Sequence, residues 1–207
     1  MKNKNRRMLK CAGGFAVLLA VALIAGCSSG DKTSTDTADS PDVTPATPAP
    51  PAPPAAVTPP VRIKAGVTEE MKDSAGNVWL ADQGFADGQT YAVTNAAVTN
   101  TPNPALYRTE RYSMTAYNFL VPNGKYTVKL HFAEVYSGIT GPGMRVFSFN
   151  VQGHEFKDFD IWVKAGGFSK AYVESADVEV TGGKLNITFT PNVENPKVNA
   201  IEILPRT

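Results

Sequence analysis

The feature that most constrains the fold of this chain is a repeated alternation of apolar and polar residues with period two. Val128, Leu130 and Phe132 share one face of a segment whose other face carries Lys129 and His131, which is typical of a half-buried β-strand. The same alternation recurs at Phe147, Phe149 and Val151, at Ala176, Val178 and Val180, at Leu185, Ile187 and Phe189, and at Ile201 and Ile203. After residue 61 no segment keeps an apolar period of 3.6 over three turns. We therefore expect an all-β domain.

Turn signals separate these segments. They are Pro122-Asn123-Gly124, Gly141-Pro142-Gly143, Gln152-Gly153, Gly166-Gly167 and Gly182-Gly183. Many short strands at this spacing favour an antiparallel β-sandwich or jelly roll. We expect the connections 137–144 and 164–170 to be loops, where binding residues tend to concentrate.

The N-terminal residues have the pattern of an export signal. Residues 1–10 are strongly basic, 15–25 are apolar, and small residues precede Cys27, the pattern of a secretory signal. The apolar run is too short for a convincing membrane span. Ile24-Ala25-Gly26-Cys27 resembles the lipobox of bacterial lipoproteins. This implies a signal peptide at 1–26, a lipidated Cys27, and a place in the bacterial cell envelope, at the outer membrane if the host has one. An ordinary secretory signal that ends near a cysteine is the alternative.

Residues 27–60 are expected to form a disordered tether rich in Ser, Thr and Pro. Nine of the 16 prolines of the chain lie between Pro41 and Pro60. Such a segment has too little apolar surface to fold, and its proline half favours an extended polyproline II spacer. Glycan shielding and a PxxP ligand role remain open alternatives. Residues 61–207 form the expected folded domain.

Charge and cysteine content exclude some classes of function. Residues 61–207 hold 14 Lys and Arg against 15 Asp and Glu, with no basic stripe of the kind that a nucleic-acid partner needs. Cys11 and Cys27 are the chain's two cysteines, so the expected domain has none. It must be held together by its core alone, for which about 150 residues suffice.

Six blocks, in order, resemble the malectin domain family. They are 106–112, 121–126, 130–136, 145–147, 159–161 and 195–201, supported by Asp73, Gly76 and Trp79 near the start. The resemblance spans about residues 62–204. It implies a β-sandwich that binds carbohydrate without catalysis, glucose-containing di- or oligosaccharides above all, with the sugar held among loops at one end of the sandwich.

The resemblance also implies the site residues. Tyr112, Tyr136 and Glu194 match family positions by motif, and Tyr91, in a variable loop, is a further candidate. Tyrosine suits such a site because its ring stacks on the C–H face of a pyranose while its hydroxyl reaches a polar partner. A carboxylate accepts charge-assisted hydrogen bonds from neighbouring hydroxyls.

The chain departs from the family near the ligand. Ser137 stands where eukaryotic members often carry Phe, and Glu194 stands where Asp is more familiar. The loop 137–144 is glycine-rich and slightly longer, and 64–67 lacks the usual Asn-Ala-Gly-Gly. The preferred sugar is therefore left open.

Neighbouring residues are expected to be structural. The strand that carries Phe132 continues in phase through Glu134 to Tyr136, and Glu134 is expected to brace that corner. Arg111 is expected to pair with Glu110 or to orient a loop. The tryptophans Trp79 and Trp162 are expected to be core residues of apolar strands.

Two further classes of function remain as alternatives. A small glycoside hydrolase needs two opposed carboxylates, for which Glu110, Glu134, Asp158, Asp160 and Glu194 form the pool, although 159–161 is expected to be a structural strand. The second alternative is a structural or adhesive envelope protein that binds a protein partner. His131 and His154 lack metal-ligand spacing. We expect a monomer with no metal, no cofactor and no nucleic-acid partner.

Overall fold

The computed structural model describes residues 54–207. The expected signal peptide at 1–26, the expected lipidation of Cys27 and most of the expected tether at 27–60 lie outside the described residues.

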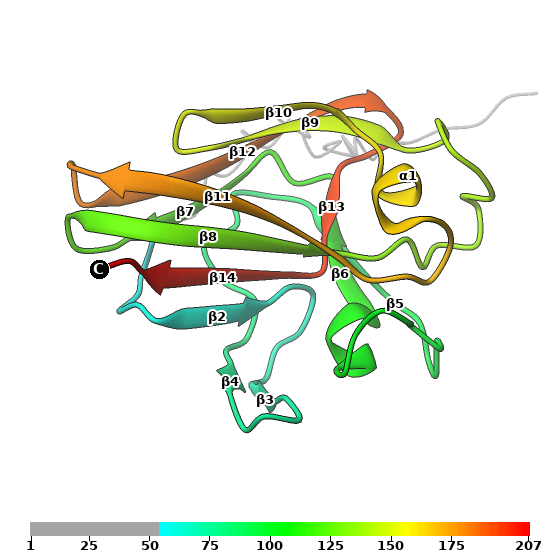
Figure 1. Cartoon of the computed structure of the whole chain (residues 1–207), viewed down its shortest axis with the longest axis horizontal. Coiled ribbons are helices and arrows are strands. Elements are labelled where there is room, and N and C mark those ends of the chain that lie inside the picture. Colours follow the sequence, from blue (N-terminus) through cyan, green and yellow to red (C-terminus); the bar gives the residue numbers. More distant parts are fainter. Residues whose placement is uncertain (1–53) are drawn as a thin grey trace, which may run out of the picture. The chain divides into compact units, whose positions relative to one another are not determined.

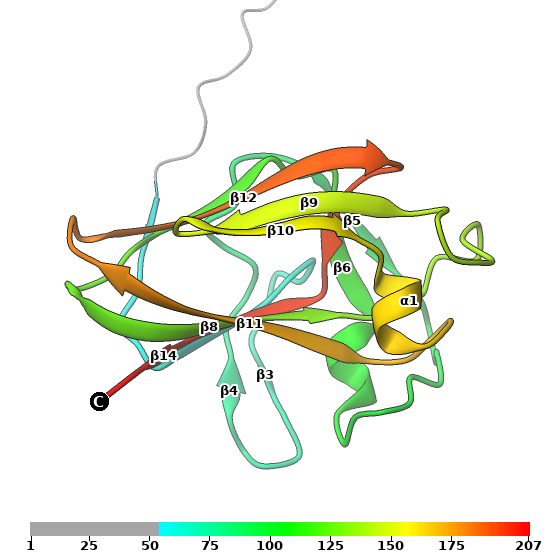
Figure 2. The ribbon, with the colours of Figure 1, turned by 45° about the horizontal axis from the view of Figure 1, so that its top comes forward.

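Two main sheets face each other (Figures 1 and 2). The first has the order β1 (Ala55–Ala56), β7 (Ala116–Leu120), β12 (Lys184–Val193), β9 (Val146–Val151) and β10 (His154–Phe159). The second has the order β11 (Tyr172–Val180), β8 (Gly124–Phe132), β14 (Ala200–Pro205) and β2 (Val61–Lys64). Their strand pairs are antiparallel, apart from the parallel pairing of β1 with β7. The expected sandwich is confirmed.

Smaller elements gather around one end and one side of this sandwich. A three-stranded sheet has the order β13 (Lys197–Val198), β6 (Thr109–Tyr112) and β5 (Gln89–Ala92), and a hairpin pairs β3 (Met71–Lys72) with β4 (Val78–Trp79). The 3₁₀ turn η1 (Pro104–Tyr107) leads into β6, and the short helix α1 (Ile161–Ala165) follows β10. In Figure 1, β5, β6 and β13 lie toward the same end of the sandwich as α1.

The alternating apolar residues fill the space between the two sheets. All members of the sets predicted from the sequence are buried, among them Val128, Leu130 and Phe132. Phe132 lies at the centre of an aromatic cluster, with ring centroids 4.9 Å from Phe159 and 5.8 Å from Phe149. This core fixes the strand register, because a slip of one residue would turn each apolar set toward water.

Phe159 lies in a strand, as predicted, but the sequence prediction was wrong about residues 160–165. Asp160 does not continue a strand: its carboxylate accepts a hydrogen bond from the backbone of Val163 (3.2 Å) and caps α1, as Asp often does at a helix start. Gly166, with a φ of 78°, ends the helix. Trp162 is therefore a half-buried residue of α1 and not a strand core residue. A helix of five residues is too short to show a period.

Two element boundaries also differ from expectation. Strand β8 ends at Phe132, so Glu134 and Tyr136 lie in the connection to β9 and not on the strand itself. At the other end, β1 precedes residue 61, since Ala55 pairs with Phe119 of β7. The alternation therefore continued beyond the true end of β8, whereas β1, with two residues, is too short to show any alternation. Among residues 54–207, the structure contains no helix with the length and hydrophobicity needed to cross a bilayer.

We predict that Phe132→Ala lowers the free energy of unfolding by about 3–5 kcal/mol, because it leaves a cavity among rings that cannot collapse to fill it. Chemical denaturation measures the change. Phe168, which is 42% exposed, is the matched control, and Phe168→Ala should cost less than about 1 kcal/mol. Equal losses in the two variants would contradict the assigned core.

Candidate binding site

One pocket of about 200 Å³ brings together all four site residues predicted from the sequence. It is lined by Tyr91, Glu110, Tyr112, Tyr136, Arg145 and Glu194. The structure therefore places Tyr91 beside the other three, although Tyr91 lies in strand β5 and not in the predicted loop. It also adds two charged residues, Glu110 and Arg145, that the sequence prediction did not assign to the site.

The floor of the pocket is one face of the three-stranded sheet. Tyr91 of β5 lies directly opposite Glu110 of β6, and Tyr112 lies opposite Gln89 of β5 and Lys197 of β13. Residues opposite one another in antiparallel strands point to the same face. The Tyr112 hydroxyl donates to Oε1 of Gln89 (2.7 Å), which fixes the ring over β5.

Tyr136 forms a wall of the pocket. Its ring meets that of Tyr91 edge to face, with centroids 5.6 Å apart and planes at 87°, a favourable geometry for two aromatic rings. Gly138 lets the ring lie across its own turn, since a Cβ there would stand 2.5 Å from Cε1 of Tyr136. The side chain is 43% exposed. A ring that is held in place yet open to solvent suits ligand contact.

Glu194 occupies a strained position at the pocket rim. It follows a register shift in β12 between Pro191 and Val193, and its φ of 62° lies in the left-handed region that glycine favours. Its Oε1 accepts a hydrogen bond from Nδ2 of Asn195 (3.0 Å). Backbone strain of this kind gathers at functional sites, so the conformation supports a role for this carboxylate.

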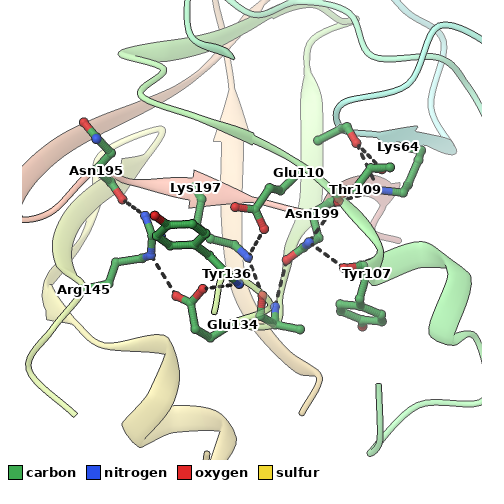
Figure 3. A network of polar contacts seen from close by, with 12 residues as sticks. Lys64, Tyr107, Thr109, Glu110, Glu134, Tyr136, Arg145, Asn195, Lys197 and Asn199 are labelled. Carbon is green, nitrogen blue, oxygen red and sulfur yellow. Dashed lines mark hydrogen bonds and ion pairs between the residues drawn. The ribbon is translucent and has the colours of Figure 1, made fainter. Parts of the chain in front are cut away.

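Buried charges hold the pocket from behind (Figure 3). Lys197 donates to the Glu110 carboxylate and to the carbonyl of Ala133. Both charged side chains are almost fully buried. This pair ties β13 to β6 and to the residue that follows β8.

A second buried pair joins two pocket walls. Glu134 accepts from the backbone N–H of Tyr136 (3.0 Å) and from Nε of Arg145 (2.8 Å). Arg145 also donates to the carbonyl of Asn195, the residue next to Glu194. The prediction that Glu134 braces this corner is confirmed.

Arg111 supports the floor from its other face. Its Nε donates to Oδ2 of Asp82 (2.7 Å) and its Nη1 to the carbonyl of Gly88 (3.1 Å). Arg111 thus orients the loop before β5, which was one of the two predicted roles. It does not pair with Glu110, which was the other. Trp79 is a core residue, as predicted, with 3% exposure.

Lys64 lies beneath β6 in the same polar layer. Its ammonium donates to the carbonyls of Ala65 (3.0 Å), Thr109 (2.8 Å) and Asn199 (3.1 Å). Burial, and then the charge of Lys197, lower the pKa of Lys64 from 10.5 to about 7, although the charges of Asp82 and Glu110 oppose this change.

The arrangement presents aromatic rings and carboxylate oxygens to one small cavity. Nothing in it points to a metal: among residues 54–207 no group of three or more His, Cys, Asp and Glu side chains could hold a metal ion. Glu110 could have been found from the sequence, because it is two residues from Tyr112 and so shares its strand face. Arg145 carries no such signal, since its partner Glu134 lies in an irregular connection.

The sequence is similar to a known domain family and to known proteins. The family model for the Malectin domain matches residues 60–201. A probable leucine-rich-repeat receptor-like serine/threonine-protein kinase of Arabidopsis thaliana is 30% identical over 161 residues, which cover 68% of this chain and 15% of the kinase. Human malectin is 33% identical over 127 residues, which cover 53% of this chain and 42% of malectin.

Solved structures share the fold. The β-glucuronidase of Bacteroides uniformis superposes with a TM-score of 0.64 at 17% identity, over 74% of this chain and 20% of the enzyme. The ANX1 ectodomain of Arabidopsis thaliana superposes with a TM-score of 0.60 at 20% identity, over 70% of this chain and 47% of the ectodomain. The chain thus spans less than half the length of each of these relatives.

We predict that the protein becomes more stable as the pH rises from about 7 to 9.5. Over this range the unfolded chain still binds a proton at Lys64, whereas the folded protein has released it, so the slope is positive and reaches about 1.4 kcal/mol per pH unit. The gain ends near pH 10, because burial raises the pKa of Tyr107 to about 12 and the unfolded tyrosine then ionises first.

Urea denaturation at several pH values measures this slope. Lys64→Met, which cannot titrate, should flatten it whatever the absolute stability of the variant. An unchanged slope in Lys64→Met would contradict the assignment.

Proposed function

Because the chain belongs to the malectin domain family, we propose that it is a non-catalytic carbohydrate-binding protein whose pocket takes a glucose-containing di- or oligosaccharide. The family binds carbohydrate. We propose in addition the class of sugar and the residues that contact it. The observation that carries it is the convergence of Tyr91, Tyr112, Tyr136 and Glu194, from four separate segments, on one pocket.

The proposed contacts follow from the chemistry of a pyranose. The exposed ring of Tyr136 packs on the C–H face of the sugar, and the hydroxyls of the tyrosines donate to or accept from its rim. Glu194 accepts from two neighbouring hydroxyls, with bonds that its charge strengthens. The site needs little rearrangement, since the edge-to-face contact between Tyr91 and Tyr136 already fixes both rings.

We further propose that a lipid on Cys27 anchors the protein in the bacterial cell envelope, with residues 28–60 as the spacer that lifts the domain from the membrane. The basic start and the apolar segment before Ile24-Ala25-Gly26-Cys27 support this part of the proposal. A diacylglyceryl group and an amide-linked acyl chain would give stable attachment, which a single chain does not. Globomycin, which blocks lipoprotein signal cleavage, should cause a precursor to accumulate, and Cys27→Ser should release the protein from the membrane.

We predict that Tyr136→Ala lowers affinity for gluco-oligosaccharides at least tenfold, because it removes the stacking face, while the melting temperature stays within about 2 °C. A glycan array followed by calorimetry on the full-length protein measures both. Phe168→Ala is the matched control, since Phe168 has nearly the same exposure, 42% against 43%, but does not line the pocket. Retained binding in Tyr136→Ala would contradict this site and favour a protein-binding role.

We predict no cleavage of bound sugar. A glycosidase needs a carboxylic acid that gives up its proton to the leaving oxygen, but Glu110, the second carboxylate in the pocket, is already engaged by Lys197. Prolonged incubation with labelled gluco-oligosaccharides, followed by chromatography, tests this. Time-dependent products that Glu194→Gln abolishes would show an enzyme instead.

A further inference from the structure

A second cavity, of about 260 Å³, lies on the outer face of the four-stranded sheet. It is lined by residues of β2, β8 and β14, by the β3–β4 hairpin and by the segment 100–107 that ends in η1. His131 of β8 reaches it because Leu130 and Phe132, its neighbours along the strand, point into the core. The two cavities share no lining residue.

One wall of this cavity is a chain of four polar side chains. Tyr107 and Nδ1 of His131 are hydrogen-bonded at 2.9 Å, as are Nε2 of His131 and Oε1 of Glu202. Arg62 then donates from Nε to Oε2 of Glu202, also at 2.9 Å. Burial opposes ionisation of Glu202, but the hydrogen bond and charge of His131, with the charges of Arg62 and Lys129, outweigh it and lower the pKa. The chain therefore holds the Arg62 guanidinium at the cavity wall.

The two carboxylates of the cavity, Glu202 and Asp73, already accept hydrogen bonds from other groups of the protein. Glu202 is engaged by His131 and Arg62, as described. The oxygens of Asp73 accept from the backbone of Ala75 and Asn77, from the Asn77 side chain and from Nε1 of Trp79, at 2.9–3.0 Å. Neither carboxylate therefore calls for a bound cation.

Other polar groups of the cavity are open to solvent and free to contact a ligand. Within residues 54–207, no hydrogen-bond partner is present for the terminal nitrogens of Arg62, for the carboxamide of Asn100 or for Oδ1 of Asn77. These groups include both donors and acceptors. Pro102 and Val173 provide apolar surface beside them.

A ligand for this cavity must match that mixture. An anion would use the donors alone, and it would meet the carboxylates of Asp73 and Glu202 in the same cavity. A hydroxyl both donates and accepts, and a sugar carries several hydroxyls on a partly apolar ring. We propose that the cavity is a second saccharide site, which takes one neutral sugar unit and makes the domain bivalent. The proposal extends the function proposed above, but it rests on a different cavity and can fail independently.

The two tryptophans of the chain make the test direct. Trp79 lines the second cavity, whereas Trp162 lies on α1 and lines neither cavity. In ¹⁵N-labelled full-length protein in detergent micelles, titration with a neutral glucose disaccharide should shift the indole signal of Trp79 and leave that of Trp162 in place. The shift should persist in Tyr136→Ala. Calorimetry should give two sugars per wild-type chain and one per Tyr136→Ala chain.

Variants of the second cavity complete the experiment. Arg62→Gln and Asn100→Gly should each abolish the Trp79 shift and leave binding at the first pocket unchanged. Glycine suits position 100 because Asn100 has a φ of 61°. The retained signals of both indoles verify folding. A glucuronic-acid disaccharide should cause a tenfold smaller response than the neutral one, since the cavity carries two carboxylates.

Two outcomes would overturn the proposal, and a third would refute only the function proposed for the first pocket. A Trp79 signal that does not move while calorimetry reports one site would remove the second site and leave the proposed function intact. A shift that disappears in Tyr136→Ala would show that Trp79 only senses the first pocket. A Trp79 shift in wild-type protein that still binds one sugar, with the same affinity in Tyr136→Ala, would support the second site and refute the first.

Discussion

The candidate pocket depends on charges buried directly behind its walls. Two ion pairs, Glu110 with Lys197 and Glu134 with Arg145, are almost fully buried. Removing charges from water is costly, and such pairs often add little net stability. Their value here is geometric. Glu110 and Lys197 join segments that are 87 residues apart, and Arg145, which pairs with Glu134 across one connection, also reaches Asn195 50 residues away.

The Arg145 side chain illustrates this. A guanidinium presents donors in a rigid fork, and here one branch reaches the Glu134 carboxylate while another reaches the carbonyl of Asn195. Glu134 in turn holds the backbone of Tyr136. The aromatic wall and the acidic rim are thus fixed to each other through one cation. Sugars offer only modest interaction energy per contact, so a preformed site keeps more of it as affinity.

Much of the sandwich could be predicted because alternation is a local property. The core residues of β8, β9, β11 and β12 follow from period two alone, and glycine pairs such as Gly182-Gly183 mark the turns. The site residues required more. Position in a family motif pointed to Tyr112, Tyr136 and Glu194, whereas Tyr91 was only a candidate from a variable loop, and the fold brings all four to one pocket.

What the sequence did not reveal was partnership across long sequence separations. Arg111 follows Glu110 directly, yet successive residues of a strand point to opposite faces, and Arg111 therefore meets Asp82 instead. Helix α1 escaped prediction because five residues cannot display a helical period, whereas the capping role of Asp160 becomes visible only with the backbone in place. Pairings of this kind depend on tertiary structure and leave no local signal.

The segment from η1 to β6 links the two cavities, since Tyr107 lines one and Glu110 lines the other. Its backbone is held firmly: Asn199 donates to the carbonyls of Tyr107 and Thr109, and Lys64 donates to that of Thr109 as well. Coupling between two sites requires an element with two alternative arrangements that both ligands bias. A segment whose carbonyls are fixed by fully buried donors offers no such alternative, so the two cavities should bind independently.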